Sequence, residues 1–548
     1  MGWLLYLLIL LQIARGAKEC LQHFHTDRYG TKQITCLCNE DYCDSLDTVA
    51  PLPDDQAYIY ITSKAGKRMN RTIAKFRTGN ERSTPILTVY PTELKQQMKG
   101  FGGTFTDGAM LNIDNLPSKA RKNLLESLFG PSGMQYSLGR VPIGSNDFST
   151  RPYTYDDWDD DVQLLNFTLM DEDISHRGAG ALLHELNRTD YWKIYANYML
   201  RYFEEYSKHG INFTMVSSQN EPNLSKSPNF PWQAMFFTPN MLVEWVQKYL
   251  GPALRTNNAT KNLELLSLEM SREQLEEYSK ALLADDRAKN FSSGIGLHWY
   301  ADDKIDASIL RKTVTEWGGR YVIYTESANG WLTNDVILGS WDRAENYVKS
   351  IMEVVNNGGA GWIDYNLCVD MNGGPSWIGN NMDAAIVVDK QNRSFLKQPM
   401  LYAVGHFSKF VRPGADYMAS RFSPNQDLPQ IHHAAFVNKD GSRVLVLYNS
   451  DSEQECNISV IDDSRSSGLL PVTLPPSSIA TVLWGFNTRP AVSEAQMSPA
   501  KEDIEDQDAA TLEREEIVAT TTVGNLSPIL SSYFQFPIIL SIIIRVLI

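Results

Sequence analysis

The sequence predicts an α/β protein in which a (β/α)8 barrel is combined with a β-sandwich and a disulfide-bonded N-terminal segment. Three observations lead to this fold class. Apolar strand segments alternate with helical segments between residues 98 and 415. Strands with alternating polarity lie on both sides of that region, at 51–97 and 416–486. Four of the six cysteines fall within residues 18–50. A chain of 548 residues is long enough to bury all of these cores.

The first 17 residues are predicted to be a secretory signal peptide. An apolar run from Trp3 to Leu11 precedes the small residues Ala14 and Gly16, which suit cleavage before Ala17. Ten Asn-X-Ser/Thr sequons agree with secretory passage and glycosylation. A short core helix is the alternative for the apolar run, but its place at the extreme N-terminus favours the signal peptide.

The cysteine cluster comes directly after this signal. In a secreted chain, four close cysteines predict two disulfides, and three pairings are possible. Zinc is the competing interpretation, but the irregular spacing and the oxidising compartment argue against it. The four residues are Cys20, Cys36, Cys38 and Cys43.

Strand patterns at the two ends of the chain predict one β-sandwich, with the large domain inserted between its halves. Within the inserted domain, strand segments are followed by loops and helices, as a parallel barrel requires. We expect barrel strands at 100–107, 137–145, 213–221, 265–270, 294–300, 321–326 and 361–367. These fill positions one, two and four to eight of the barrel.

The third barrel strand is missing from this pattern. Residues 149–190 contain polar loops and a short Gly/Ala-rich piece at 178–183, and none of them forms an apolar strand run. A barrel that lacks one strand has two exposed edges. The strand-3 region is therefore predicted to be deleted, with damage to the barrel and weak or absent hydrolysis as the expected consequence.

Two strand-end glutamates are the strongest candidates for catalysis. Glu221 closes the segment 213–221 and Glu326 closes 321–326, and the C-terminal ends of barrel strands face the active site. A pair of such carboxylates is typical of a glycosidase. Each glutamate alone is more often a solvated loop residue, so the prediction rests on the pair.

Further polar and aromatic residues fall at the same strand ends. Taken singly, each is better explained as a core imidazole, a structural ion pair or a packing aromatic. Their repetition at the ends of successive strands favours one shared site. The residues are Arg140, Asp147, Asn220, His298, Tyr300, Trp362, Asp364 and Tyr365.

These motifs resemble glycosyl hydrolase family 30, and within it the acid β-glucosidases. The resemblance covers about Cys20 to Trp484 and leaves out the acidic tail. It is carried by Gly100-Phe-Gly-Gly, Arg140-Val-Pro, Asp147-Phe-Ser, Asn220-Glu-Pro, His298-Trp-Tyr, Gly339-Ser-Trp-Asp-Arg, Gly373-Gly-Pro-Ser-Trp and Gly405-His-Phe-Ser-Lys-Phe. It implies a (β/α)8 barrel, an immunoglobulin-like sandwich and a small disulfide-bonded β subdomain. Relative to the family, about thirty residues with strand 3 are absent near 173–178.

The resemblance also implies roles for site residues. Glu221 resembles the acid/base and Glu326 the nucleophile of a retaining mechanism. His298 and Tyr300 are expected to orient Glu326. The remaining expected substrate-binding residues are Arg140, Asp147, Asn220, Trp299, Tyr365 and Asn380, with Asn220 addressing the sugar 2-OH and Tyr365 replacing a family Trp.

The implied reaction is hydrolysis of glucosylceramide to glucose and ceramide in the lysosome or another acidic secretory compartment. Glucosylceramide at membrane surfaces, a saposin-type activator protein and anionic lipid are the implied partners, and no metal or cofactor is expected. The formal charge of −15 and the absence of a basic patch argue against nucleic acid. Another family-30 β-glycosidase, such as a xylan-cleaving one, and a catalytically silent homologue are the alternatives.

Residues 487–548 are predicted to form a disordered acidic tail that ends in a hydrophobic segment. That segment is long enough to cross a bilayer, and it also resembles a C-terminal anchor signal. A C-terminal membrane anchor is therefore one hypothesis for the tail.

Overall fold

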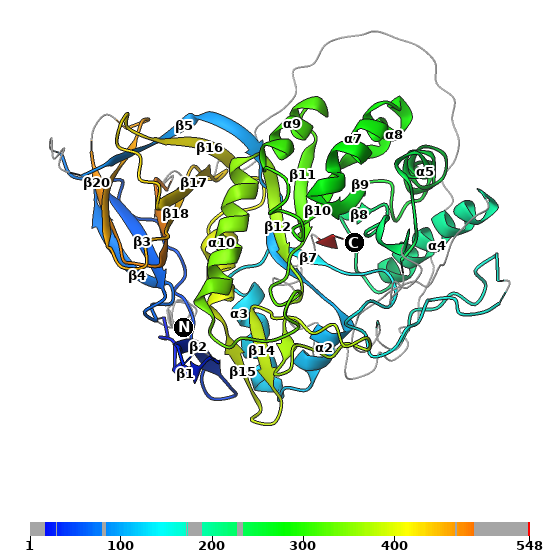
Figure 1. The fold of residues 1–548 in the computed structure, drawn as a ribbon, viewed down its shortest axis with the longest axis horizontal. Helices are drawn as coiled ribbons and strands as arrows, with labels where there is room; N and C mark the ends of the chain where they lie inside the picture. Colours follow the sequence, from blue (N-terminus) through cyan, green and yellow to red (C-terminus); the bar gives the residue numbers. More distant parts are fainter. Residues whose placement is uncertain are drawn as a thin grey trace, which may run out of the picture.

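A computed structural model describes residues 17–28, 30–78, 84–159, 161–170, 173, 189–226, 234–465, 468–486 and 546–547. The predicted signal peptide and nearly all of the C-terminal tail lie outside these residues. Figure 1 shows a β-rich region next to a larger domain of parallel strands and helices, as the fold class predicted.

The larger domain is built on a parallel sheet. Seven of its strands follow in the spatial order β7 (Leu138–Arg140), β6 (Gly100–Thr104), β12 (Gly359–Asp364), β11 (Tyr321–Glu326), β10 (Ser292–His298), β9 (Glu264–Ser271) and β8 (Met215–Ser217). They correspond to the seven barrel strands predicted from the sequence. β12 consists entirely of buried residues, because strands of a parallel barrel are covered on both faces.

Helices surround this sheet. α5 begins with Pro239 after the N-cap Thr238, whose hydroxyl accepts from the Met241 N–H over 3.2 Å. A five-residue π-helical turn at 246–250 joins α5 to α6. The helices are α2 (Asp107–Asp114), α3 (Ser118–Phe129), α4 (Thr189–Lys208), α5 (Pro239–Trp245), α6 (Gly251–Thr256), α7 (Leu275–Leu283), α8 (Asp286–Phe291), α9 (Ser308–Glu316), α10 (Trp341–Asn356) and α11 (Pro399–Ser408).

The third strand position of the barrel differs from the other seven. Among the described residues between β7 and α4 there is no strand, and residues 174–188 lie outside the described part of the chain. No pairing joins β7 to β8 in the described sheet. Instead, the outer edge of β7 pairs in parallel with β22 (Val546–Leu547), from the far end of the chain (Figure 1). The sequence did not suggest this pairing.

The β-sandwich is one nine-stranded sheet assembled from both ends of the chain. A bridge between Arg77 and Leu469 brings its two outer strands together. Its interior is apolar, with Leu87, Leu447 and Trp484 fully buried. The spatial order is β20 (Leu470–Leu474), β19 (Cys456–Asp462), β5 (Ile86–Gln97), β16 (Asp416–Phe422), β17 (Ile431–Val437), β18 (Arg443–Asn449), β21 (Ser478–Trp484), β3 (Gln56–Ser63) and β4 (Asn70–Lys75).

The N-terminal segment forms a third sheet, which is larger than residues 18–50 alone. Three strands from within the predicted barrel region, 98–415, complete it, so the subdomain is not continuous in sequence. Its order is β1 (Gln22–Thr26), β2 (Lys32–Cys38), β15 (Ser394–Lys397), β14 (Ile386–Asp389) and β13 (Val369–Asp370). Of the three possible disulfide pairings, the structure has Cys20–Cys36 and Cys38–Cys43.

Candidate active site

A cavity of about 640 Å³ opens at the C-terminal ends of the parallel strands. Both candidate glutamates line it, together with Arg140, Asp147 and Tyr300. These residues come from loops or strand ends far apart in sequence. The barrel topology brings them together because all of its strands run in the same direction.

Glu221 lies in the turn that follows β8. Its backbone has a φ of 44°, in the left-handed region that non-glycine residues rarely adopt. The turn is held by the Glu221 N–H, which donates to the carbonyl oxygen of Glu269 over 2.9 Å. This directs the side chain into the cavity, where Oε1 lies 2.9 Å from Nδ1 of His298.

Glu326 is the last residue of β11 and receives two strong donors. Nη1 of Arg140 donates to Oε2 over 2.6 Å, and the hydroxyl of Tyr300 donates to Oε1 over 2.8 Å. Both donors stabilise negative charge on this carboxylate. One carboxylate oxygen of Glu326 and one of Glu221 lie within 4.8 Å of each other.

The buried carboxylate of Glu269 contacts the two cationic side chains that lie against Glu221 and Glu326. Oε1 of Glu269 lies 3.1 Å from Nη2 of Arg140 and 3.5 Å from Nε2 of His298. Burial acts against ionisation of Glu269, but Arg140 and His298 overcome it and lower the pKa of Glu269 to about 2. Burial likewise opposes charge on His298, but Glu326, Glu221 and Glu269 raise its pKa to about 10.

Another part of the cavity wall is formed around Asp147. Its Oδ1 accepts from the Tyr365 hydroxyl, and its Oδ2 accepts from Nδ2 of Asn380 over 2.7 Å. Burial raises the pKa of Asp147 to about 7. A protonated or ionised carboxyl with two fixed neighbours is well suited to binding sugar hydroxyls.

Most of the residues predicted for the site are brought together by the fold. Asn220 also lines the cavity, and its Oδ1 accepts from Nη2 of Arg140 over 2.8 Å. Four predictions differ from the geometry. Trp362 and Asp364 were expected at the site but do not line this cavity; Asp364 instead accepts from the Tyr347 hydroxyl. Trp299 does not line this cavity; it packs against Tyr347 and Trp362 and lines a second cavity of about 490 Å³.

His298 was expected to orient Glu326, but its nearest carboxylate is Glu221, and Glu326 Oε1 is 3.7 Å away. Sequence reasoning also missed two residues of the site. Glu269 lies inside a predicted strand and was not predicted to belong to the site. The sequence offered one signal for it, a charged residue within an apolar run. Trp331 lines the cavity from a loop and stacks edge-on against Tyr300, with ring centroids 5.1 Å apart.

The described residues contain two groups with metal-like spacing. In one of them, Cys38 and Cys43 are joined in a disulfide and have no free thiolate to offer. The other is Glu221, His298 and Glu326. With a pKa of about 10, His298 is protonated at neutral pH, and a protonated imidazole is a donor on both nitrogens. In the structure, Nδ1 of His298 lies 2.9 Å from Oε1 of Glu221 and 3.7 Å from Oε1 of Glu326, so the three residues are paired with one another.

Comparison with protein families identifies the two large domains. Residues 98–178 and 173–411 match the Glycosyl hydrolase family 30 TIM-barrel domain, and residues 414–482 match the Glycosyl hydrolase family 30 beta sandwich domain. The chain belongs to glycosyl hydrolase family 30. Its barrel match is divided into two pieces that meet at 173–178, in the same segment where the sequence lacks a third strand.

Individual relatives place this family-30 chain near glucosylceramidases. It is 33% identical to "Lysosomal acid glucosylceramidase" of Mus musculus over 86% of this chain and 96% of the relative. It is 35% identical to "Putative glucosylceramidase 2" of Caenorhabditis elegans over 87% of this chain and 97% of the relative. Among solved structures, SrfJ from Salmonella typhimurium is 26% identical with a TM-score of 0.71, covering 78% of this chain and 99% of SrfJ.

Proposed function

We propose that this family-30 glycosidase is a retaining β-glucosidase that hydrolyses glucosylceramide to glucose and ceramide. The observation that carries the proposal is the placement of Glu221 and Glu326, with carboxylate oxygens within 4.8 Å of each other. Retaining glycosidases hold their two carboxyl groups about 5 Å apart, whereas inverting ones need roughly 6.5–9.5 Å for an intervening water.

The environments of the two glutamates support different roles. Glu326, fixed by Arg140 and Tyr300, is the nucleophile that attacks the anomeric carbon and forms the glycosyl-enzyme. Glu221 protonates the leaving oxygen as that bond breaks. It then takes a proton from the water that releases the sugar. His298, 2.9 Å from Glu221, holds the carboxyl in place through both steps.

The wall around Asp147 is the proposed sugar-binding side. Asn380 and Tyr365 both donate hydrogen bonds to Asp147, so the positions of the three side chains are set before substrate arrives. Asn220 is proposed to bind the 2-OH, next to the nucleophile. Trp331 provides a ring at the cavity wall for sugar or lipid contact.

A lipid aglycone is supported by the apolar side chains beside the cavity. Trp331 is 38% exposed and the adjacent Leu332 is 77% exposed, so two large apolar side chains face solvent next to the cavity. We propose that they meet the membrane surface that carries the substrate. A saposin-type activator and anionic lipid are the partners proposed by similarity to glucosylceramidases.

The compartment proposed for this activity is the lysosome or another acidic lumen of the secretory pathway. Two disulfides and a lysosomal relative support it. In the part of the chain that the structure describes, no helix has the length and apolar character needed to cross a membrane. The proposed C-terminal anchor falls almost entirely outside those residues.

The proposal is tested with the purified chain and glucosylceramide in vesicles containing phosphatidylserine at pH 5. The expected products are ceramide and β-glucose, formed slowly because the third barrel strand is absent, with the anomeric configuration read by NMR at early times. A 2-deoxy-2-fluoro-glucoside should label the wild type, and Glu326→Gln should abolish the label. Faster cleavage of a β-xyloside than of the β-glucoside would favour another family-30 activity. A folded chain that is neither labelled nor active would favour the silent homologue.

A further inference from the structure

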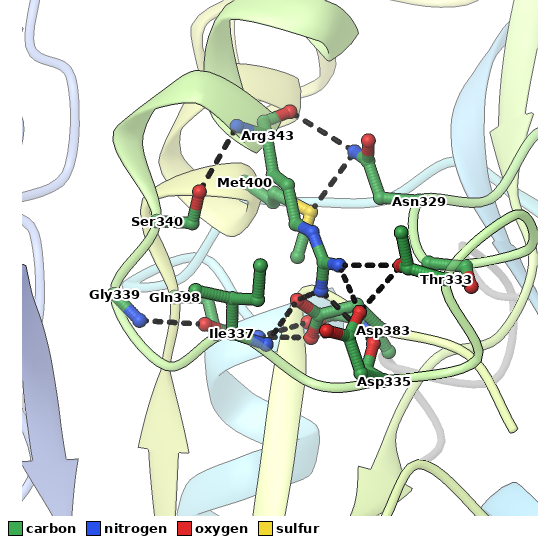
Figure 2. Close-up of polar contacts among 12 residues, drawn as sticks. Asn329, Thr333, Asp335, Ile337, Gly339, Ser340, Arg343, Asp383, Gln398 and Met400 are labelled. Atoms are coloured by element: carbon green, nitrogen blue, oxygen red, sulfur yellow. Dashed lines mark hydrogen bonds and ion pairs between the residues drawn. The ribbon is translucent and has the colours of Figure 1, made fainter. Parts of the chain in front are cut away.

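Arg343 is a buried cation that the proposed mechanism does not use. It lies in the first turn of α10, where its N–H donates to the Ser340 hydroxyl over 3.3 Å. Only 6% of the residue is exposed, and it does not line the catalytic cavity. Figure 2 shows its side chain reaching between two loops, residues 327–340 and 371–385. We call these the β11–α10 loop and the β13–β14 loop.

The guanidinium fixes the β11–α10 loop through three hydrogen bonds. Nη1 donates to the carbonyl oxygen of Asp335 over 3.0 Å, and Nη2 donates to Oδ1 of Asp335 over 2.6 Å. Nη2 also donates to the Thr333 hydroxyl over 3.3 Å. The backbone of Arg343 adds a fourth bond, because its carbonyl accepts from Nδ2 of Asn329 over 3.0 Å. These bonds therefore hold both the first half of the loop, at Asn329 and Thr333, and the second half, at Asp335.

The same guanidinium reaches the β13–β14 loop through Asp383, which is fully buried. Nη1 donates to Oδ2 of Asp383, and that oxygen also accepts from the Ile337 N–H over 3.1 Å. Oδ1 accepts from Nε2 of Gln398, whose own Oε1 accepts from the Gly339 N–H over 2.8 Å (Figure 2). Arg343 and Asp383 thus join the two loops into one hydrogen-bonded unit.

In each loop, a residue that lines the catalytic cavity lies close in sequence to a member of this hydrogen-bonded unit. Trp331, two residues before Thr333, lies against Tyr300, whose hydroxyl donates to Glu326. Asn380, three residues before Asp383, donates to Asp147. The two loops that supply these residues therefore share the guanidinium of Arg343, and they also meet directly where the Asp383 N–H donates to the carbonyl oxygen of Asn329 over 2.9 Å.

We propose that Arg343 is a positioning residue that sets substrate binding by fixing the two loops that carry Trp331 and Asn380 at the cavity. This inference rests on the proposed glucosidase function. Without Arg343, the β11–α10 loop loses three hydrogen bonds from the guanidinium and its link to Asp383, so the loops lose their fixed positions. The buried carboxylate of Asp383, left without a counter-charge, separately lowers the stability of the fold. Lysine cannot replace it, because an ammonium does not reach three acceptors in a planar fork.

The test compares Arg343→Gln, Arg343→Lys and wild type on an aryl β-glucoside. We expect KM to rise about tenfold or more in Arg343→Gln, with kcat per labelled site within threefold and an unchanged pH–rate profile. Arg343→Lys should be intermediate. Counting active sites with the fluoro-glucoside label removes any effect of unfolded protein. An unchanged KM in Arg343→Gln would overturn the inference.

Two further variants separate positioning from stability. Arg343→Gln/Asp383→Asn removes the unpaired buried carboxylate, so it should recover thermal stability but keep the raised KM. Arg68→Gln removes another buried arginine, which donates to the carbonyl oxygens of Ser63 and Ile34 away from the cavity. It should lower stability without changing KM. A raised KM in Arg68→Gln, or a normal KM in the double variant, would show that stability alone explains the effect.

Chemical rescue offers a direct readout. Arg343 and Thr333 line the second cavity of about 490 Å³, so a small cation can reach the vacated position. Millimolar guanidinium chloride should lower the KM of Arg343→Ala and leave that of Arg68→Ala unchanged. The absence of any difference between the two variants would count against the inference.

If the wild type is inactive, the proposed function fails, and the affinity for 1-deoxynojirimycin, measured by calorimetry, replaces KM as the readout. Equal affinities for wild type and Arg343→Gln, or no binding to either, would then overturn the inference.

Discussion

Arg140 donates from Nη1 to Oε2 of Glu326 over 2.6 Å, and the contact joins the ends of two strands that are not neighbours in the sheet. The same guanidinium contacts Glu269 at 3.1 Å. Although burial opposes its charge, Glu269 and Glu326 raise the pKa of Arg140 above its usual range. Arg140 thus links the proposed nucleophile to the buried carboxylate beneath it.

Replacing Arg140 should slow formation of the glycosyl-enzyme. Hydrogen bonds to charged groups contribute roughly 1.5–3 kcal/mol, which corresponds to about 10- to 150-fold in rate. We expect Arg140→Met to reduce the rate of fluoro-glucoside labelling by roughly that factor, measured by intact-protein mass spectrometry. Arg121→Met, which removes a cation paired with Asp114 on the helical side, serves as the control. Labelling of Arg140→Met at the wild-type rate would contradict the role.

Three titrating groups of the site should make stability depend on pH in opposing directions. Burial raises the pKa of Asp147 from 3.8 to about 7, so its proton is favoured in the folded state and stability falls as pH rises from about 4 to 7. The raised pKa of His298 gives stability that is complete below 6.5 and lost toward pH 10. The lowered pKa of Glu269 gives stability that is present above 4.5 and lost toward pH 2.

Other buried groups titrate in the same range, since burial lowers the pKa of His433 to about 4 and that of Lys409 to about 7. The contribution of Asp147 is therefore measured as a difference between variants, by differential scanning fluorimetry across pH 3–9. The thermal unfolding midpoint of the wild type relative to that of Asp147→Asn should fall between pH 4 and 7. A difference that stays constant or rises over that range would contradict the assignment of Asp147.

Glu269→Gln should destabilise the barrel far more than loss of a surface glutamate. The change keeps the side-chain size but breaks buried contacts to Arg140 and His298. Breaking a buried ion pair on one side costs about 3–5 kcal/mol. Urea unfolding measures the difference. Glu276→Gln, which removes an exposed partner of Lys280 and Lys312, should leave the urea midpoint unchanged.

The residues at strand ends were predictable because barrel topology sends them to one place. Glu221, Glu326, Arg140 and Asp147 needed only strand boundaries and residue types. Glu269 was not predictable in the same way, since a carboxylate inside an apolar strand has meaning only once its cationic neighbours are known. The partner of His298 depends on ring orientation, and no sequence pattern encodes that.

Contacts made by residues in long loops also could not be predicted from the sequence. Trp299 follows His298 in a motif, but the chain turns after β10 and buries its ring against Tyr347 and Trp362. Asp383 and Arg343 lie forty positions apart and meet only because two loops fold onto the same side of the barrel. Hydrophobic periodicity carries no information about such contacts. The pairing of β22 with β7 was missed for the same reason.

The end of the chain should stabilise the open edge of the barrel. Val546 pairs with Gly139 and Leu547 pairs with Arg140, along the edge of β7 that a third strand would occupy. An uncovered edge exposes unpaired backbone groups and promotes association between chains. Truncation after Phe486 should therefore lower the thermal midpoint and produce aggregates in light scattering. Val546→Pro with Leu547→Pro should act in the same direction, because proline cannot donate to a strand ladder. Deletion of residues 498–516 alone removes the acidic segment but keeps the end, so it is the matched control and should behave as wild type. A truncated chain with an unchanged midpoint and no aggregation would show that β22 contributes nothing to the stability of the barrel.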